Sequence, residues 1–106
     1  MASGILGQSA LGASSNTTVY TVPASTHAVV NVSILNRSSS AASTVRLAIS
    51  ATGSPSNSEW IEYDVSVPKS AVLERTAISL NAGKNVVAYA SGSDVSVSVY
   101  GIEQAV

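Results

Sequence analysis

Short runs in which apolar residues alternate with small polar ones constrain this chain more than any other feature of its sequence. In one run Val95, Val97 and Val99 occupy every second position, and Ser96 and Ser98 lie between them. Successive side chains of an extended strand point to opposite faces, so this pattern gives one apolar face and one polar face. No segment of helical length carries an apolar stripe of comparable strength. The pattern therefore predicts half-buried β-strands.

Seven such runs follow one another after residue 16, separated by clusters of Gly, Pro, Asn and Ser. They cover residues 17–22, 28–35, 43–50, 59–67, 71–80, 85–90 and 94–102. Connections this short favour antiparallel pairing, because a parallel crossover needs about a dozen residues or more. We therefore predict an all-β fold, an antiparallel β-sandwich of about seven strands, either immunoglobulin-like or of jelly-roll type.

Residues 1–16 have a different texture, rich in Gly, Ala and Ser, with isolated apolar residues at Ile5, Leu6 and Leu11. This segment has neither a helical stripe nor strand alternation. Two interpretations are open, an extended arm or a disordered terminus of the kind common at chain ends. Because its apolar residues exceed what a solvated tail requires, we divide the chain into an extended N-terminal arm (1–16) and a sandwich domain (17–106). The three apolar residues are candidate interface residues.

Charge is scarce in this chain. Its 106 residues are 45% hydrophobic but only 10% charged, with a formal net charge of -1, whereas about 25% is usual for a globular domain. Nucleic-acid binding relies on clustered Lys and Arg, so we expect no nucleic-acid partner. We expect no membrane partner either, because no stretch approaches the roughly 20 apolar residues of a membrane span. A net charge near zero does little to keep copies apart, which favours a homo-oligomer.

The chain has few residues of the types used for catalysis or metal binding. The chain has no cysteine, and His27 is its one histidine. A lone histidine without cysteine partners is a poor start for a zinc site, and no Gly-x-Ser-x-Gly motif accompanies it. We predict that the protein is not an enzyme and has no catalytic residue, metal or cofactor, and we interpret His27 as an ordinary turn or surface residue.

One acidic cluster surrounds the single tryptophan. Regular alternation places Trp60, Glu62 and Asp64 on one face of their strand, opposite Ile61 and Tyr63. Paired carboxylates can serve glycoside hydrolysis or calcium binding, but we favour a solvated or interface-facing strand edge. Trp60 either caps the core or is an exposed anchor for a protein or a sugar. We therefore name Trp60, Glu62 and Asp64 as candidate interface residues.

Two arginines, Arg46 and Arg75, lie in mid-strand beside apolar neighbours. Such arginines commonly pair with a carboxylate across a strand. Glu62 and Asp64 are the expected partners.

Several short motifs follow one another along the chain. They are Gly7-Gln8, Thr18-Val19-Tyr20-Thr21-Val22-Pro23-Ala24, Val30-Asn31-Val32, Asn36-Arg37, Val45-Arg46-Leu47-Ala48-Ile49, Glu62-Tyr63-Asp64, Leu80-Asn81-Ala82-Gly83 and Val99-Tyr100-Gly101. In order and spacing this succession resembles small virion structural proteins of tailed bacteriophages, cyanophages among them, over nearly the whole chain. The resemblance implies a β-sandwich presented on the virion, without catalytic residues and in contact with the major capsid protein or tail proteins.

With this resemblance, the expected function is that of a phage virion structural protein. The first expectation is a capsid decoration or cement protein, which stabilises the head through subunit–subunit contacts. The alternative is a tail or fibre module that contacts host surface glycans, because Trp60 lies beside Glu62 and Asp64.

Overall fold

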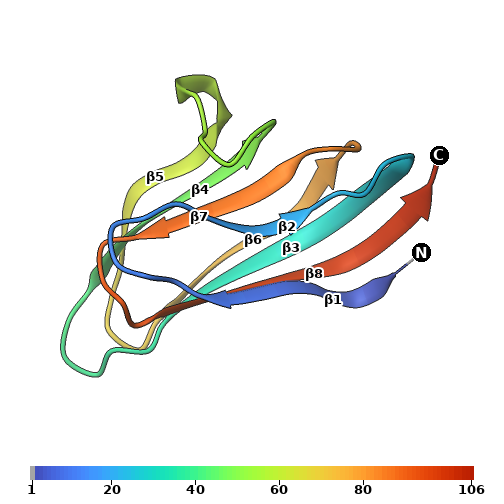
Figure 1. Cartoon of the computed structure of the whole chain (residues 1–106). Coiled ribbons are helices and arrows are strands. Elements are labelled where there is room, and N and C mark those ends of the chain that lie inside the picture. The colour runs from blue at the N-terminus through green and yellow to red at the C-terminus, as the bar shows by residue number, and fades with distance from the viewer. Residues whose placement is uncertain (1) are drawn as a thin grey trace.

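Residues 2–106, which the computed structural model describes, form eight β-strands and one short 3-10 helix, η1. They are β1 (Ser3–Ala10), β2 (Thr17–Thr21), β3 (Thr26–Asn36), β4 (Ser43–Ser50), η1 (Asn57–Glu59), β5 (Trp60–Val67), β6 (Val72–Leu80), β7 (Asn85–Ala90) and β8 (Val95–Ala105). The strands form two antiparallel four-stranded sheets that pack against each other, and both termini lie at one end (Figure 1). The predicted antiparallel β-sandwich is confirmed.

The strand order defines the type of sandwich. Sheet A has the order β1-β8-β3-β6, and sheet B has the order β2-β7-β4-β5. Strands pair as β1 with β8, β2 with β7, β3 with β6 and β4 with β5. These are the pairs of one long antiparallel ribbon, rolled up so that its successive parts alternate between the sheets. An eight-stranded double sheet of this kind is a jelly roll, and not an immunoglobulin-like sandwich.

The core is built by the alternation that the sequence shows. In β8, Val95, Val97 and Val99 are buried between the sheets, whereas Ser96 and Ser98 lie on the outer face. Inward residues of the other central strands, mostly valine, leucine and alanine, complete the same cluster. Full burial of each valine or leucine side chain contributes about 1.5–3 kcal/mol, so these rows supply the main stabilisation.

The segment predicted as an arm is part of the sandwich from residue 3 onward. β1 is the edge strand of sheet A, paired with β8, and Leu11 is fully buried in the core. Leu6 lies at a bulge in β1 and packs against the core, while Ile5 is exposed. The bulge interrupts the alternation of inward and outward side chains, so the sequence of this segment does not show the pattern of a strand. Met1, the first residue of the predicted arm, lies outside the described residues.

One side of the sandwich is closed by close approach of the edge strands β1 and β2. A Cβ atom at Gly7 of β1 would overlap the carbonyl oxygen of Val19 in β2. Glycine at position 7 therefore lets the two backbones come together.

On the opposite side of the sandwich, an ion pair joins the edge strands β6 and β5. Arg75 of β6 donates to Glu62 of β5 at 2.6 Å and to the carbonyl oxygen of Ile61 at 3.4 Å. Both charged side chains point inward, because their partners in register, Val32 and Leu47, are core residues. Inward-pointing charges on edge strands deter pairing with the edge of another chain. This edge is thereby protected against growth of the sheet.

Candidate functional site

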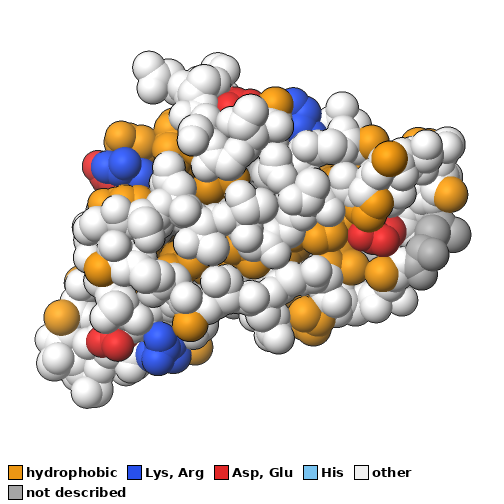
Figure 2. Space-filling view, in the orientation of Figure 1, with side chains coloured by type: hydrophobic (Ala, Val, Ile, Leu, Met, Phe, Trp, Pro, Cys, Tyr) orange, Lys and Arg blue, Asp and Glu red, His pale blue; other side chains and the backbone are white. Residues whose placement is uncertain are grey.

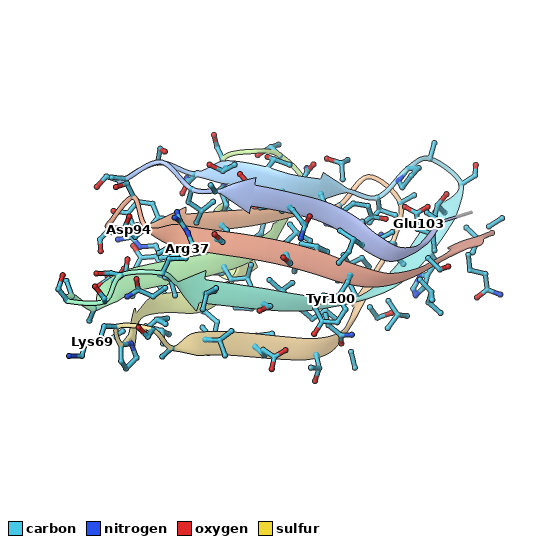
Figure 3. All side chains as sticks on the ribbon, turned by 90° about the horizontal axis from the view of Figure 1, so that it is seen from below. Arg37, Lys69, Asp94, Tyr100 and Glu103 are labelled. Atoms are coloured by element: carbon cyan, nitrogen blue, oxygen red, sulfur yellow. The ribbon has the colours of Figure 1, made fainter. Side chains whose placement is uncertain are left out.

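The outer face of sheet A carries almost no charge, and we call it the low-charge face. It consists of Ser3, Ile5, Gln8 and Ala10 of β1, Ser96, Ser98, Tyr100, Ile102 and Gln104 of β8, His27, Val29, Asn31, Ser33 and Leu35 of β3, and Val72, Glu74 and Ser79 of β6. Among these residues Glu74 is the one carboxylate, and there is no Lys or Arg. Figure 3 looks onto this sheet and shows Arg37, Lys69 and Asp94 at one end and Glu103 at the other.

Large apolar side chains are exposed at both ends of the low-charge face. At one end Leu35 and Val72 lie opposite each other in the ladder of β3 and β6, and a group of three lies at the other end. Ile5 is 58% exposed, Ile102 56% and Val29 37%. Ile102 lies opposite Val29 in the ladder of β8 and β3, and opposite Ser3, two residues from Ile5, in the ladder with β1. We call Ile5, Val29 and Ile102 the apolar patch. Apolar side chains gathered in this way on an exposed surface commonly mark an interaction site.

The centre of the low-charge face is polar, and its side chains bond to one another. Tyr100 reaches across β3 to donate its hydroxyl to Glu74 of β6 at 3.1 Å, and this hydrogen bond, followed by burial, raises the tyrosine pKa. Gln8 donates to Ser98 Oγ at 3.1 Å. Because these polar groups already have partners, a protein that covers them leaves few donors or acceptors unpaired.

The structure places His27 next to a serine, which the sequence does not reveal. His27 Nε2 lies 2.9 Å from Ser79 Oγ, across the ladder of β3 and β6. Nucleophilic catalysis also needs a group that orients the imidazole and donors that stabilise the oxyanion. Within residues 2–106 no carboxylate is hydrogen-bonded to this imidazole, and its partner in β8 is Gln104. We therefore describe the pair as a cross-strand hydrogen bond and assign it no catalytic role.

A second surface feature lies on the outer face of sheet B. We call Arg46, Trp60, Tyr63, Asp64 and Tyr89 the tyrosine–arginine cluster. Arg46 Nε donates to Asp64 Oδ1 at 2.6 Å, and its Cζ lies 4.2 Å from the ring centroid of Tyr63 and 4.5 Å from that of Tyr89. The ring of Tyr63 also contacts Trp60 edge to face, with centroids 5.4 Å apart. The hydrogen bond to Asp64, above all, raises the pKa of Arg46.

The register of β4 and β5 explains this cluster. A bulge leaves two residues of β5, Tyr63 and Asp64, opposite the single Arg46 of β4, and Asp64 adopts a left-handed φ of 54°. A second bulge follows nearer the start of β5. Since a bulge shifts the alternation by one residue, Glu62 points inward to Arg75 while Tyr63 and Asp64 both meet Arg46 on the outside.

The regular alternation predicted for residues 59–67 is therefore wrong at these bulges. Glu62 points inward and does not share the outer face with Trp60 and Asp64, and each carboxylate has its own arginine on a different strand. The prediction that Arg46 and Arg75 pair with these two carboxylates is confirmed, both at 2.6 Å. A pair of free carboxylates for hydrolysis or calcium is not formed by these residues.

Glu59 holds the loop between β4 and β5 over the outer face of sheet B. Its carboxylate accepts hydrogen bonds from the backbone of Ser56 and of Ala51, both at 2.9 Å, and from Ser50 Oγ at 3.0 Å. These bonds, that from the Ser56 backbone first, lower the pKa of Glu59 to about 2. The sequence does carry a signal for this residue, since Ser56-Asn57-Ser58-Glu59 has the spacing of a capping box.

This depressed pKa predicts how the loop responds to acid. A carboxylate whose folded pKa is lowered contributes stability that is present above its ordinary pKa and is lost as the pH falls through the folded value. We expect the amide NMR signals of Ala51 and Ser56 to change with a midpoint near pH 2. The variant Glu59→Gln should show the loosened loop already at neutral pH. A midpoint near the ordinary glutamate value of 4.5 in the wild-type chain would contradict this description.

Together these features define a small jelly-roll domain with two unlike outer faces, one nearly uncharged and one with a tyrosine–arginine cluster. Comparison of the chain with protein-family models, with curated proteins and with solved structures finds no match in any of the three. No helix of the described part of the chain is long and apolar enough to cross a membrane.

Proposed function

We propose that this protein is a non-enzymatic structural subunit of a phage virion, a decoration or cement protein of the capsid that binds neighbouring subunits through its low-charge face. The observation that carries the proposal is the apolar patch of Ile5, Val29 and Ile102 on a sheet face with one carboxylate and no basic residue. The face of the molecule shown in Figure 2 likewise has few charged side chains among many apolar and neutral ones.

The free energy available from the apolar patch favours binding within an assembly over binding between two isolated molecules. Full burial of an apolar side chain contributes about 1.5–3 kcal/mol, and the three side chains of the patch are already partly covered. Association itself costs on the order of 4–15 kcal/mol. One small patch therefore gives weak binding alone, whereas a subunit that touches several neighbours in a lattice gains from every contact at once.

The jelly-roll fold and the charged edge strands β5 and β6 support the same function. Jelly rolls are a common architecture of viral capsid domains, although a fold class by itself does not define a function. The inward charges of β5 and β6 oppose docking edge to edge, which leaves the broad sheet faces for contact. The sequence resemblance to tailed-phage virion proteins agrees with a position on the particle, next to the major capsid protein or to further copies of the chain.

The proposal predicts that one charge in the apolar patch prevents docking. Particles of the phage that encodes the chain, made without this protein, should rebind the purified wild-type chain, and Ile102→Asp should weaken the binding at least about tenfold, or about 1.4 kcal/mol. Ser66→Asp places the same charge at an exposed position of β5 in sheet B and is the matched control. Co-sedimentation with quantitative mass spectrometry measures the occupancy.

Equal occupancy of the particles by Ile102→Asp and Ser66→Asp would disprove docking through this face. Failure of the wild-type chain to bind, together with its absence from intact particles, would disprove the virion function itself.

A further inference from the structure

We propose that the tyrosine–arginine cluster binds the ring of a neutral sugar, such as a pyranose at the surface of a glycan. The site consists of Arg46, Tyr63, Asp64 and Tyr89 on the outer face of sheet B, and it does not depend on the low-charge face of sheet A. It differs from the tryptophan-centred site that the sequence indicated, because Tyr63 and Arg46 take the places of Trp60 and Glu62.

The guanidinium of Arg46 is held by its neighbours before any ligand binds. The guanidinium of Arg46 lies within 4.5 Å of two tyrosine ring centroids and is tied to Asp64 through Nε, so the arginine side chain is only 26% exposed. A planar group fixed in this way loses little conformational freedom on binding. Preorganised charged groups can therefore bind a small ligand that a mobile surface arginine could not hold.

The cluster keeps both donors and acceptors free. Arg46 donates through Nε to Asp64, and its two terminal nitrogens donate to no protein group within residues 2–106. Within the same residues, Asp64 Oδ2 and the hydroxyls of Tyr63 and Tyr89 have no protein partner. A sugar hydroxyl both donates and accepts. Neighbouring hydroxyls of one pyranose can thus accept from Arg46 while they donate to Asp64.

The charges of the cluster decide which class of ligand fits. Arg46 and Asp64 form a pair with no net charge, at 2.6 Å. An anionic ligand that approaches Arg46 meets the Asp64 carboxylate, and a cationic ligand meets Arg46, so a neutral molecule avoids both repulsions. Tyr63, which is 55% exposed, adds an amphipathic ring against which the apolar C–H face of a sugar can pack.

The site is compatible with the proposed docking of the protein on a particle. The cluster lies on the outer face of sheet B, on the far side of the sandwich from the low-charge face. A copy that docks through sheet A therefore presents the cluster away from the particle. Binding of a sugar can be tested on the purified chain without the particle, so failure of docking and failure of sugar binding are distinguishable.

The test is an NMR titration of the full-length, isotope-labelled chain with neutral methyl glycosides of mannose, glucose, galactose and N-acetylglucosamine. We expect at least one of them to give saturable shifts at Arg46 Nε and at the amides of 63, 64 and 89, with a dissociation constant on the order of 1–10 mM. Tyr63→Ala should weaken this binding at least about tenfold, the loss expected for a ring that carries about 1.4 kcal/mol.

Two further variants separate the site from general effects on the fold. Asp64→Asn keeps the size of the side chain and tolerates the positive φ, and it should weaken binding severalfold while the chain stays folded. Arg75→Gln removes the other arginine–carboxylate pair, which joins β6 to β5 at the edge of the sandwich, and should bind like the wild type. Absence of shifts with every neutral glycoside up to about 100 mM would overturn the proposal. So would shifts that Tyr63→Ala and Asp64→Asn both retain, or shifts at the cluster caused only by inorganic phosphate or methyl glucuronide.

Discussion

Replacement of Gly101 by alanine is expected to lower the free energy of unfolding by about 3 kcal/mol or more. Gly101 lies in β8, opposite Val30 of β3, at a φ of 154° that side chains rarely adopt. A Cβ atom there would overlap the carbonyl oxygen of Val29 and lie 2.9 Å from Val30 Cα. Neither backbone atom can move away without breaking the ladder of the two central strands of sheet A. Strain and overpacking therefore add, at about 1–3 kcal/mol each.

Urea denaturation of Gly101→Ala and of a control, Gly12→Ala, measures this effect. At Gly12 an added Cβ would meet only Ser15 Oγ at 3.5 Å, an ordinary contact, so its stability should stay within about 0.5 kcal/mol of the wild type. For a domain of this size, 3 kcal/mol corresponds to a fall in Tm of roughly 12 °C or more. A Gly101→Ala variant as stable as Gly12→Ala would show that β3 and β8 do not approach as described.

The second large effect is expected at Asn36, a fully buried polar side chain at the end of β3. Its Nδ2 donates to the carbonyl oxygens of Ala41 at 2.9 Å and Val67 at 3.1 Å, and its Oδ1 accepts from Ser38 N at 3.0 Å. Alanine at this position leaves these three backbone groups without their partner, next to a small cavity. The loss of stability should be about 2–4 kcal/mol, since each buried group left unpaired costs about 1–3 kcal/mol.

Asn31→Ala is the matched control for Asn36→Ala. Asn31 also accepts a backbone hydrogen bond, from Ala77 N at 3.0 Å, but it does so on the outer face, where water can replace the amide. The loss at Asn31 should stay below about 1 kcal/mol. Equal losses at the two positions in thermal or urea denaturation would contradict the role of Asn36 as a buried link between β3, the following loop and β5.

The sandwich itself could be predicted from the sequence, because period-two burial is a local property of each strand. The valines of β8 face the core as their spacing indicates. The choice between sandwich types could not be predicted, since strand order depends on pairings between residues far apart, such as Ser3 with Ile102. β1 could not be predicted as a strand, because the bulge after Ile5 and the glycines around it interrupt the alternation of apolar and polar residues that identifies the other strands.

The surface features were only partly predictable, for the same physical reason. The pairing of Arg46 with Asp64 follows from strand neighbours, but the two bulges in β5 decide that Tyr63 joins them outside and that Glu62 turns inward. A bulge depends on the partner strand and leaves no clear mark in a short sequence. The exposed Val29 does leave a trace, because it breaks the alternation beside Val30 and so places an apolar side chain on the polar face.

Leu11 shows how an isolated apolar residue can mislead. The sequence made Leu6 and Leu11 interface candidates, yet Leu11 is 2% exposed and Leu6 packs against the core. Of the three interface candidates in residues 1–16, Leu6 is half-buried and Ile5 is exposed, and Ile5 lies near Ile102 of β8. The candidate docking surface thus forms only when the two terminal strands pair.

The proposed docking through the low-charge face can be seen directly in a cryo-EM reconstruction of the phage particle to which we assign this protein. We expect each copy to lie with β1, β8, β3 and β6 against a neighbouring protein subunit, and with Ile5 and Ile102 covered by it. Density in which this sheet faces solvent in every copy, while the chain is held by its other face or its edges, would contradict the proposed role of the low-charge face.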